Sequence, residues 1–92
     1  MAFQMKTEEY TSTLQNKYTF QSVIPSKWAQ IVDRITDKHG KLLNTLAMPA
    51  LLEHVVAEPS GLKMDDFEDW EELEEVTMAA FRFQRKRKSN NS

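Results

Sequence analysis

The chain has 92 residues, of which 40% are hydrophobic and 28% are charged, and its formal net charge is −2. This length suits one small domain, because two domains would each be too short to bury a self-sustaining core. The absence of cysteine excludes disulfides, thiolate metal sites and thiol nucleophiles. Two glycines and three prolines are too few for the many turns of a sandwich or barrel, so the composition favours a mainly α-helical protein.

The N-terminal part of the chain is mostly polar. We expect residues 1–14 to form a flexible segment, residues 15–86 a single helical domain, and residues 87–92 a disordered basic and polar tail. The stretch Tyr18–Val23 is rich in aromatic and β-branched residues with a period of two, which predicts a short strand. One strand is not stable alone, so it pairs with residues 8–14, with residues 55–58, or across a subunit boundary.

Two helices are predicted in the middle of the chain. The first opens at Pro25, follows an amphipathic pattern from Trp28 to Ile35 and stops at Gly40. The second contains Pro49, and a proline deep inside a helix costs about 3 kcal/mol. We therefore expect this helix to start near residues 45–48, with Pro49 in its first turn, and to run to about His54.

The third predicted helix opens at Met64 or Asp65, with Asp65 and Glu68 as a capping box, and continues to residue 86. At about 1.5 Å per residue it would be roughly 33 Å long, so part of it would project from the body. The sequence thus predicts a small bundle of about three helices, with a short N-terminal β strand or hairpin and a long charged C-terminal helix.

Charge is segregated along the chain. Residues 65–75 hold eight acidic residues and no basic one, whereas residues 76–92 hold five basic residues and no acidic one. This order favours a helix through its macrodipole. It also predicts charged docking positions, which are Asp65, Asp66, Glu68, Arg85, Lys86, Arg87 and Lys88.

The third helix also has an aromatic stripe larger than a chain of this size readily covers. Such rings dominate interfaces, and a helix with opposite charges at its two ends can pair antiparallel with its own copy. The other interpretation is that the stripe closes over the first two helices. The candidate partner and oligomer contacts are Trp70, Leu73, Thr77, Phe81 and Phe83.

Sequence motifs for catalysis or cofactors are absent. His39 and His54 do not form a helical zinc or di-iron motif, and no phosphate-binding glycine loop is present. The acidic block has no central glycine and does not fit a calcium loop. We expect no enzyme activity, no cofactor and no metal.

The order of elements resembles the tail assembly chaperones of long-tailed (siphovirus-type) bacteriophages. The resemblance covers residues 15 to about 83. It is based on the Tyr18–Phe20 strand, the Trp28–Ile35 helix before Gly40, the segment LLEHVV followed by Pro59, and the acidic opening DDFEDWEELEEV of the last helix.

The resemblance implies a small α-helical chaperone that binds the tape-measure protein and keeps it soluble during tail assembly. It also implies action in the host cytoplasm, absence from the mature virion, self-association, and a longer frameshifted form of the same protein as a further partner. No apolar run reaches the 18 or so residues of a membrane span, and the N-terminus lacks the features of a signal peptide, so no membrane contact is expected.

Two other functions are kept open. The run Arg85–Lys88 could bind the backbone of nucleic acid, as in a small DNA-associated regulator. Nucleic acid is not expected as the main partner, because the domain is net acidic and DNA-binding proteins present a basic face. A virion head–tail connector component is the other alternative, and it differs from a chaperone in being found in purified particles.

Overall fold

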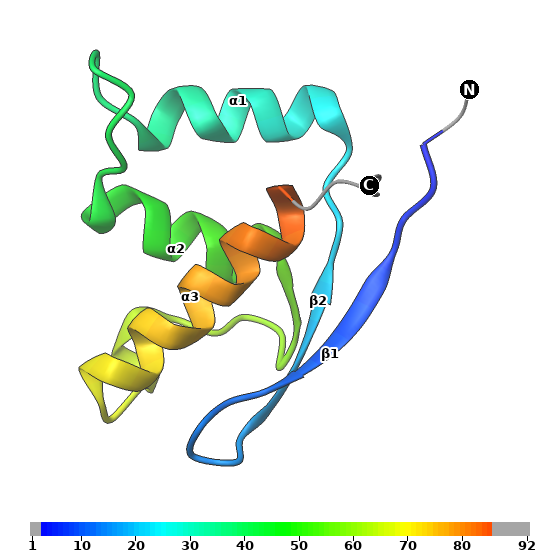
Figure 1. The fold of residues 1–92 in the computed structure, drawn as a ribbon, viewed down its shortest axis with the longest axis vertical. Coiled ribbons are helices and arrows are strands. Elements are labelled where there is room, and N and C mark those ends of the chain that lie inside the picture. Colours follow the sequence, from blue (N-terminus) through cyan, green and yellow to red (C-terminus); the bar gives the residue numbers. More distant parts are fainter. Residues whose placement is uncertain (1–2, 86–92) are drawn as a thin grey trace.

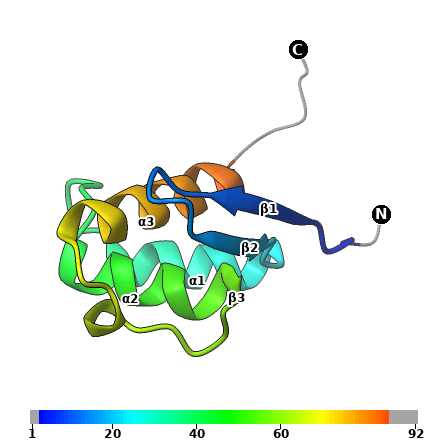
Figure 2. The same ribbon diagram turned by 90° about the horizontal axis from the view of Figure 1, so that it is seen from below.

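A computed structural model describes residues 3–85 (Figure 1). Its elements in chain order are β1 (Thr7–Thr11), β2 (Lys17–Gln21), α1 (Pro25–Ile35), α2 (Asn44–His54), β3 (Val56–Glu58), the short 3-10 helix η1 (Met64–Asp66) and α3 (Trp70–Arg85). The three strands form one antiparallel sheet with β2 in the centre. In Figure 2, α3 lies on one side of α1 and α2, with the sheet beside them.

The fold is therefore a mixed α/β domain, and the prediction of a mainly α bundle is wrong. The predicted strand is present as β2, and both pairings within the chain that were left open occur. The other two strands have no clear alternation of apolar and polar residues in the sequence, for physical reasons. β1 is almost entirely exposed, and β3 has only three residues. They are held by contacts with β2: the ring of Tyr10 stacks 5.4 Å from that of Phe20, and Val56 pairs with Phe20 from 36 positions away.

The N-terminal segment also differs from expectation, because residues 7–11 belong to the sheet. The expected boundary at residue 14 falls inside the turn between β1 and β2. That turn is closed by two backbone hydrogen bonds of 2.9 Å, from the Ser12 N–H to the Asn16 carbonyl and from the Gln15 N–H to the Ser12 carbonyl. The tail expected at residues 87–92 lies outside the described residues.

Helix α1 begins at Pro25 as predicted but ends at Ile35, before the expected stop at Gly40. The backbone leaves the helix because Thr36 pairs with Leu42 in an isolated bridge. Gly40 adopts a φ of +80° in the turn between them, the left-handed region that glycine enters without strain. Gly40 therefore belongs to the turn between Thr36 and Leu42 and does not end the helix.

Helix α2 starts at Asn44, so the prediction that Pro49 lies in its first turn is wrong. Pro49 is on the exposed side of the helix. Because proline has no N–H, it cannot donate to the carbonyl of Thr45, and that exposed carbonyl can bond to water instead. The opposite side buries Ala47, Met48, Leu51 and Leu52. Their burial stabilises the helix across the proline.

Helix α3 starts at Trp70, not at Met64 or Asp65. The backbone is extended at Phe67, whose ring stacks 6.3 Å from that of Tyr18, and this contact interrupts the predicted helix. The Asp69 carboxylate then accepts from the N–H of Glu71 (3.0 Å) and caps the new start. The predicted Asp65–Glu68 capping box is replaced by Asp66, which accepts from the N–H of Lys63 (2.9 Å) in η1.

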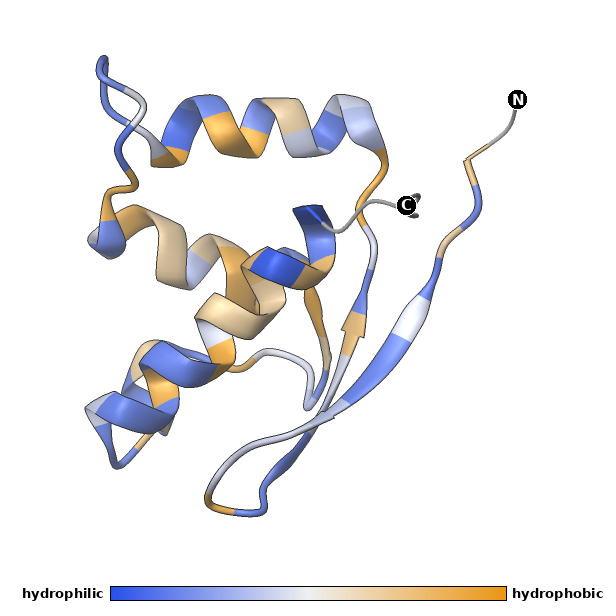
Figure 3. Ribbon diagram, viewed as in Figure 1, coloured by the Kyte–Doolittle hydropathy of each residue, from blue (hydrophilic) through white to orange (hydrophobic). Residues whose placement is uncertain are grey.

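The helix that results has 16 residues and is about 24 Å long, shorter than predicted. Its C-terminal half packs on the body and does not project, because Ala79 and Ala80 are buried and Phe83 lies against Phe20. Figure 3 shows the hydrophilic N-terminal part of α3 and η1 beside the more apolar α2. The end of α3 is fastened by Gln84, whose amide accepts from the Val23 N–H (2.8 Å) and donates to the Val23 carbonyl (3.2 Å).

We expect Gln84→Ala to lower the free energy of unfolding by about 1–3 kcal/mol, because both backbone groups of half-buried Val23 lose their partner. Urea unfolding followed by circular dichroism measures the loss. Gln30→Ala is the matched control, since it makes the same change at an exposed position of α1. Equal effects in the two variants would contradict the role of Gln84.

Candidate interaction surfaces

Two carboxylates of α3 hold the hairpin of β1 and β2 against the helix. The hydroxyl of Tyr18 donates to Glu72 Oε2 (2.7 Å), and the side-chain amide of Asn16 donates to the same oxygen (3.2 Å). One turn further on, Glu75 accepts from the Tyr10 hydroxyl (2.7 Å) and from the N–H of Thr13 (3.0 Å). The hairpin turn is therefore anchored to the acidic half of α3.

Glu72 is only 4% exposed. Burial by itself raises the pKa of this carboxyl group, but the hydrogen bonds from Tyr18 and Asn16, together with the nearby Ser12 side chain, outweigh burial and hold the pKa below its usual value. The pKa values of the two tyrosines are raised instead. Burial and the Glu75 carboxylate raise the pKa of Tyr10 to about 12, and burial and the Glu72 carboxylate raise the pKa of Tyr18. Glu72 is thus ionised and Tyr18 protonated at neutral pH.

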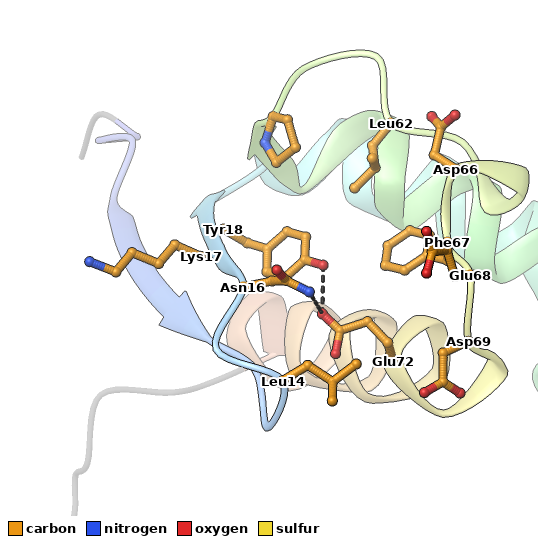
Figure 4. A pocket seen from close by; sticks show the side chains of 11 residues that line it. Leu14, Asn16, Lys17, Tyr18, Leu62, Asp66, Phe67, Glu68, Asp69 and Glu72 are labelled. Carbon is orange, nitrogen blue, oxygen red and sulfur yellow. Dashed lines mark hydrogen bonds between the residues drawn. The ribbon is translucent and has the colours of Figure 1, made fainter.

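Beside this anchor lies an open cavity of about 690 Å³, which we call the acidic cleft (Figure 4). Its walls come from the hairpin turn, the segment after β3, and the start of α3. Four acidic residues and one basic residue line it, together with apolar side chains. The lining residues are Leu14, Asn16, Lys17, Tyr18, Pro59, Leu62, Asp66, Phe67, Glu68, Asp69 and Glu72.

A second cavity of about 530 Å³, the aromatic groove, lies between the hairpin and the C-terminal half of α3. Rings from both strands and from the helix form its apolar part, and charged side chains border it. The lining residues are Glu8, Tyr10, Phe20, Ala79, Phe81, Arg82, Phe83 and Arg85. The groove and the acidic cleft are thus associated with opposite ends of α3.

The five candidate contacts of the aromatic stripe do not form one surface. Leu73 and Thr77 are buried in the core, and the Thr77 hydroxyl donates to the Leu73 carbonyl (2.8 Å). Phe81 and Phe83 line the aromatic groove, and Phe81 also packs against Trp28. Trp70 is 53% exposed at the first position of α3.

The charged candidates are divided among three places. Asp66 and Glu68 line the acidic cleft, whereas Asp65 lines a separate pocket against α2. The guanidinium of Arg85 lies 5.3 Å from the centre of the Phe81 ring, at the aromatic groove. Lys86, Arg87 and Lys88 lie outside the described residues.

Sequence reasoning missed Tyr10, Leu14, Lys17, Tyr18 and Glu72 as site residues. A signal for Glu72 is nevertheless present: it lies at helical spacing from Val76, Ala79 and Phe83, so an acid occupies the apolar stripe of the last helix. An acid at such a position needs a buried donor, and Tyr18 of the predicted strand is one that the sequence offers. Which donor binds Glu72 and which binds Glu75 depends on the register of the β1–β2 hairpin.

No family model, curated protein or solved structure matches this chain. Among residues 3–85, no cluster of histidine and acidic side chains is arranged to hold a metal ion. In the same residues, no helix combines the length and apolar character that crossing a bilayer requires.

We expect the contribution of Glu72 to stability to depend on pH in a defined direction. Because its folded pKa lies below the unfolded value, the native state binds fewer protons, and the free energy of unfolding rises with pH through that interval. The contribution is complete at neutral pH and is lost as the pH falls below about 4.5 through the folded pKa.

Tyr18→Phe removes the shortest donor to Glu72. We expect it to raise the Glu72 pKa and to cost about 1.5–3 kcal/mol at pH 7. Carboxyl NMR titration and urea unfolding measure the two effects. Tyr10→Phe deletes a hydroxyl that binds Glu75 instead, so it should leave the Glu72 titration in place. An unmoved Glu72 titration in Tyr18→Phe would contradict the assignment.

Proposed function

We propose that this protein is a non-catalytic phage tail assembly chaperone that binds the tape-measure protein through the aromatic groove. In this proposal it keeps the tape-measure protein soluble in the host cytoplasm and is absent from the finished particle. The element order that resembles the chaperone family supports the function, although the mixed α/β fold replaces the mainly α one that the resemblance implied.

The aromatic groove is the observation that carries the proposal. Four rings, those of Tyr10, Phe20, Phe81 and Phe83, line a surface cavity that is bordered by Arg82 and Arg85. Aromatic and arginine side chains are the residues that contribute most to binding at protein interfaces. A groove of this kind suits the apolar face of an amphipathic helix, with the arginines available to acidic side chains at its edge.

Strand β1 adds a second feature to the same region. Among residues 3–85 it is an outer strand whose sheet partner is β2, and it contributes Glu8 and Tyr10 to the groove. An outer strand offers backbone groups to a partner. Strand β1 therefore offers a strand edge beside the apolar side chains of the groove, which suits a long, aggregation-prone client protein.

Neither alternative function has comparable support among the described residues. The nucleic-acid interpretation depends on the run Arg85–Lys88, of which only Arg85 is described, and that guanidinium lies over Phe81. A head–tail connector would be found in purified particles, which the chaperone proposal excludes.

The test is co-expression with the tape-measure protein of the same phage. We expect the chain to keep that protein soluble and to co-purify with it, and Phe81→Ala to reduce the co-purified amount about tenfold by removing a ring from the groove. Met78→Ala is the matched control, because Met78 is an exposed apolar residue of α3 outside the groove.

Both variants are first compared with the parent by circular dichroism and thermal unfolding, since Phe81 also contacts Trp28. A folded Phe81→Ala variant that binds as well as Met78→Ala would place the contact elsewhere. Failure of the parent chain to solubilise or bind the tape-measure protein would overturn the proposed function.

A further inference from the structure

We propose that the acidic cleft binds the basic run of a second copy of this chain, residues 85–88, in a head-to-tail contact between subunits. The inference concerns self-association and does not depend on the proposed function, because it can be measured with this protein alone.

The cleft and the basic run are complementary in charge. Asp66, Glu68, Asp69 and Glu72 line the cleft with Lys17 as the one basic residue among them. The sequence places four basic residues in succession, Arg85 to Lys88, with no acidic residue after position 75. Opposite potentials of this kind guide association and set the orientation of two partners.

The cleft also contains a buried carboxylate oxygen that has no hydrogen-bond partner among the described residues. Glu72 lines the cleft and is 4% exposed, and its Oε1 is buried with no hydrogen-bond partner among the described residues, while Oε2 accepts from Tyr18 and Asn16. Buried polar atoms are nearly always paired, and a charged oxygen without a donor is costly. A cationic side chain entering the cleft would supply positive charge next to this carboxylate.

Apolar side chains line the cleft beside its carboxylates. Leu14 is 56% exposed at its edge, and Leu62 and Phe67 are half-buried within it. Figure 4 shows these side chains around the same opening as the carboxylates. Such surfaces accommodate the long aliphatic stems of lysine and arginine while the charged ends contact acids.

Distance indicates that the basic run comes from another copy. The rim residues Asp66 and Glu68 precede α3, and the basic run begins at Arg85, the last residue of α3, about 22 Å away along the helix axis. Figures 1 and 2 both show the two ends of α3 far apart. From Arg85 to Lys88 the backbone spans at most about 11 Å, which covers half of that length. A second copy has no such restriction.

Each cleft takes the basic run of another copy, so one contact joins two different surfaces. Two copies that exchange their runs reciprocally close a twofold dimer, whereas a contact made in one direction continues to a ring or an open chain.

The experiment uses the full chain with two variants, each blocked at one surface. The tail variant carries Arg87→Glu and Lys88→Glu and keeps its cleft. The cleft variant carries Glu68→Lys, at an exposed position, and keeps its basic run. Circular dichroism confirms that both are folded. Sedimentation velocity at about 50 mM and about 500 mM NaCl then measures their association.

We expect the parent chain to associate at low salt and to weaken at least about tenfold at high salt, as contacts between exposed charges do. Each variant alone should be monomeric, and an equimolar mixture should give a 1:1 complex, because the intact cleft of one variant accepts the intact run of the other. Lys17→Glu, which adds an acid to the cleft, should strengthen association of the parent chain.

Three results would overturn the proposal. They are a parent chain that is monomeric at low salt, a folded variant that associates alone as strongly as the parent, and a mixture of variants that stays monomeric. The last two would assign self-association to a different surface, such as a symmetric contact between aromatic grooves.

Discussion

The arrangement of this small domain depends on the buried carboxylate of Glu72. It lies on the apolar side of α3, where an ionised group is tolerated only with donors close by. Tyr18 and Asn16 supply them from β2 and the preceding turn, and Glu75 repeats the arrangement with Tyr10 and Thr13 one turn later. The last helix and the first two strands, distant in sequence, are thus joined by a polar network that specifies how they face each other.

That network also lies between the acidic cleft and the aromatic groove. Towards the start of α3, the hairpin turn and the segment after β3 leave the acidic cleft open. Towards its end, the same hairpin and the helix form the aromatic groove. The segregation of charge in the sequence therefore becomes a segregation in space, because α3 keeps its acidic and basic ends about 22 Å apart. The proposed chaperone role uses the groove, and the proposed self-association uses the cleft, so both can occur in one assembly.

Sequence reasoning succeeded where a single element contains its own signal. The amphipathic pattern from Trp28 to Ile35, the aromatic strand at Tyr18–Phe20 and the end of the second helix at His54 are of this kind. It failed where a distant residue decides the local structure. Phe67 leaves the helical conformation to stack on Tyr18, and Pro49 is accommodated because its side of α2 is exposed. Leu73 and Thr77 have the same spacing as Phe81, yet they are buried in the core.

The sequence by itself determined the small single domain, the absence of cysteine chemistry, the positions of the helical patterns, and the order of acidic and basic charge. These follow from composition and from periodicity within a few residues. Only the tertiary structure decided that residues 7–11 and 56–58 complete a sheet, that Glu72 is buried beneath the hairpin, and which aromatic rings line a groove. The pairing of residues 56–58 and the burial of Glu72 arise from contacts more than 30 positions apart, such as Phe20 with Val56 and Tyr18 with Glu72. Residues 7–11 pair with the nearby β2, but the Tyr10 hydroxyl binds Glu75, 65 positions away, and no local pattern contains that contact.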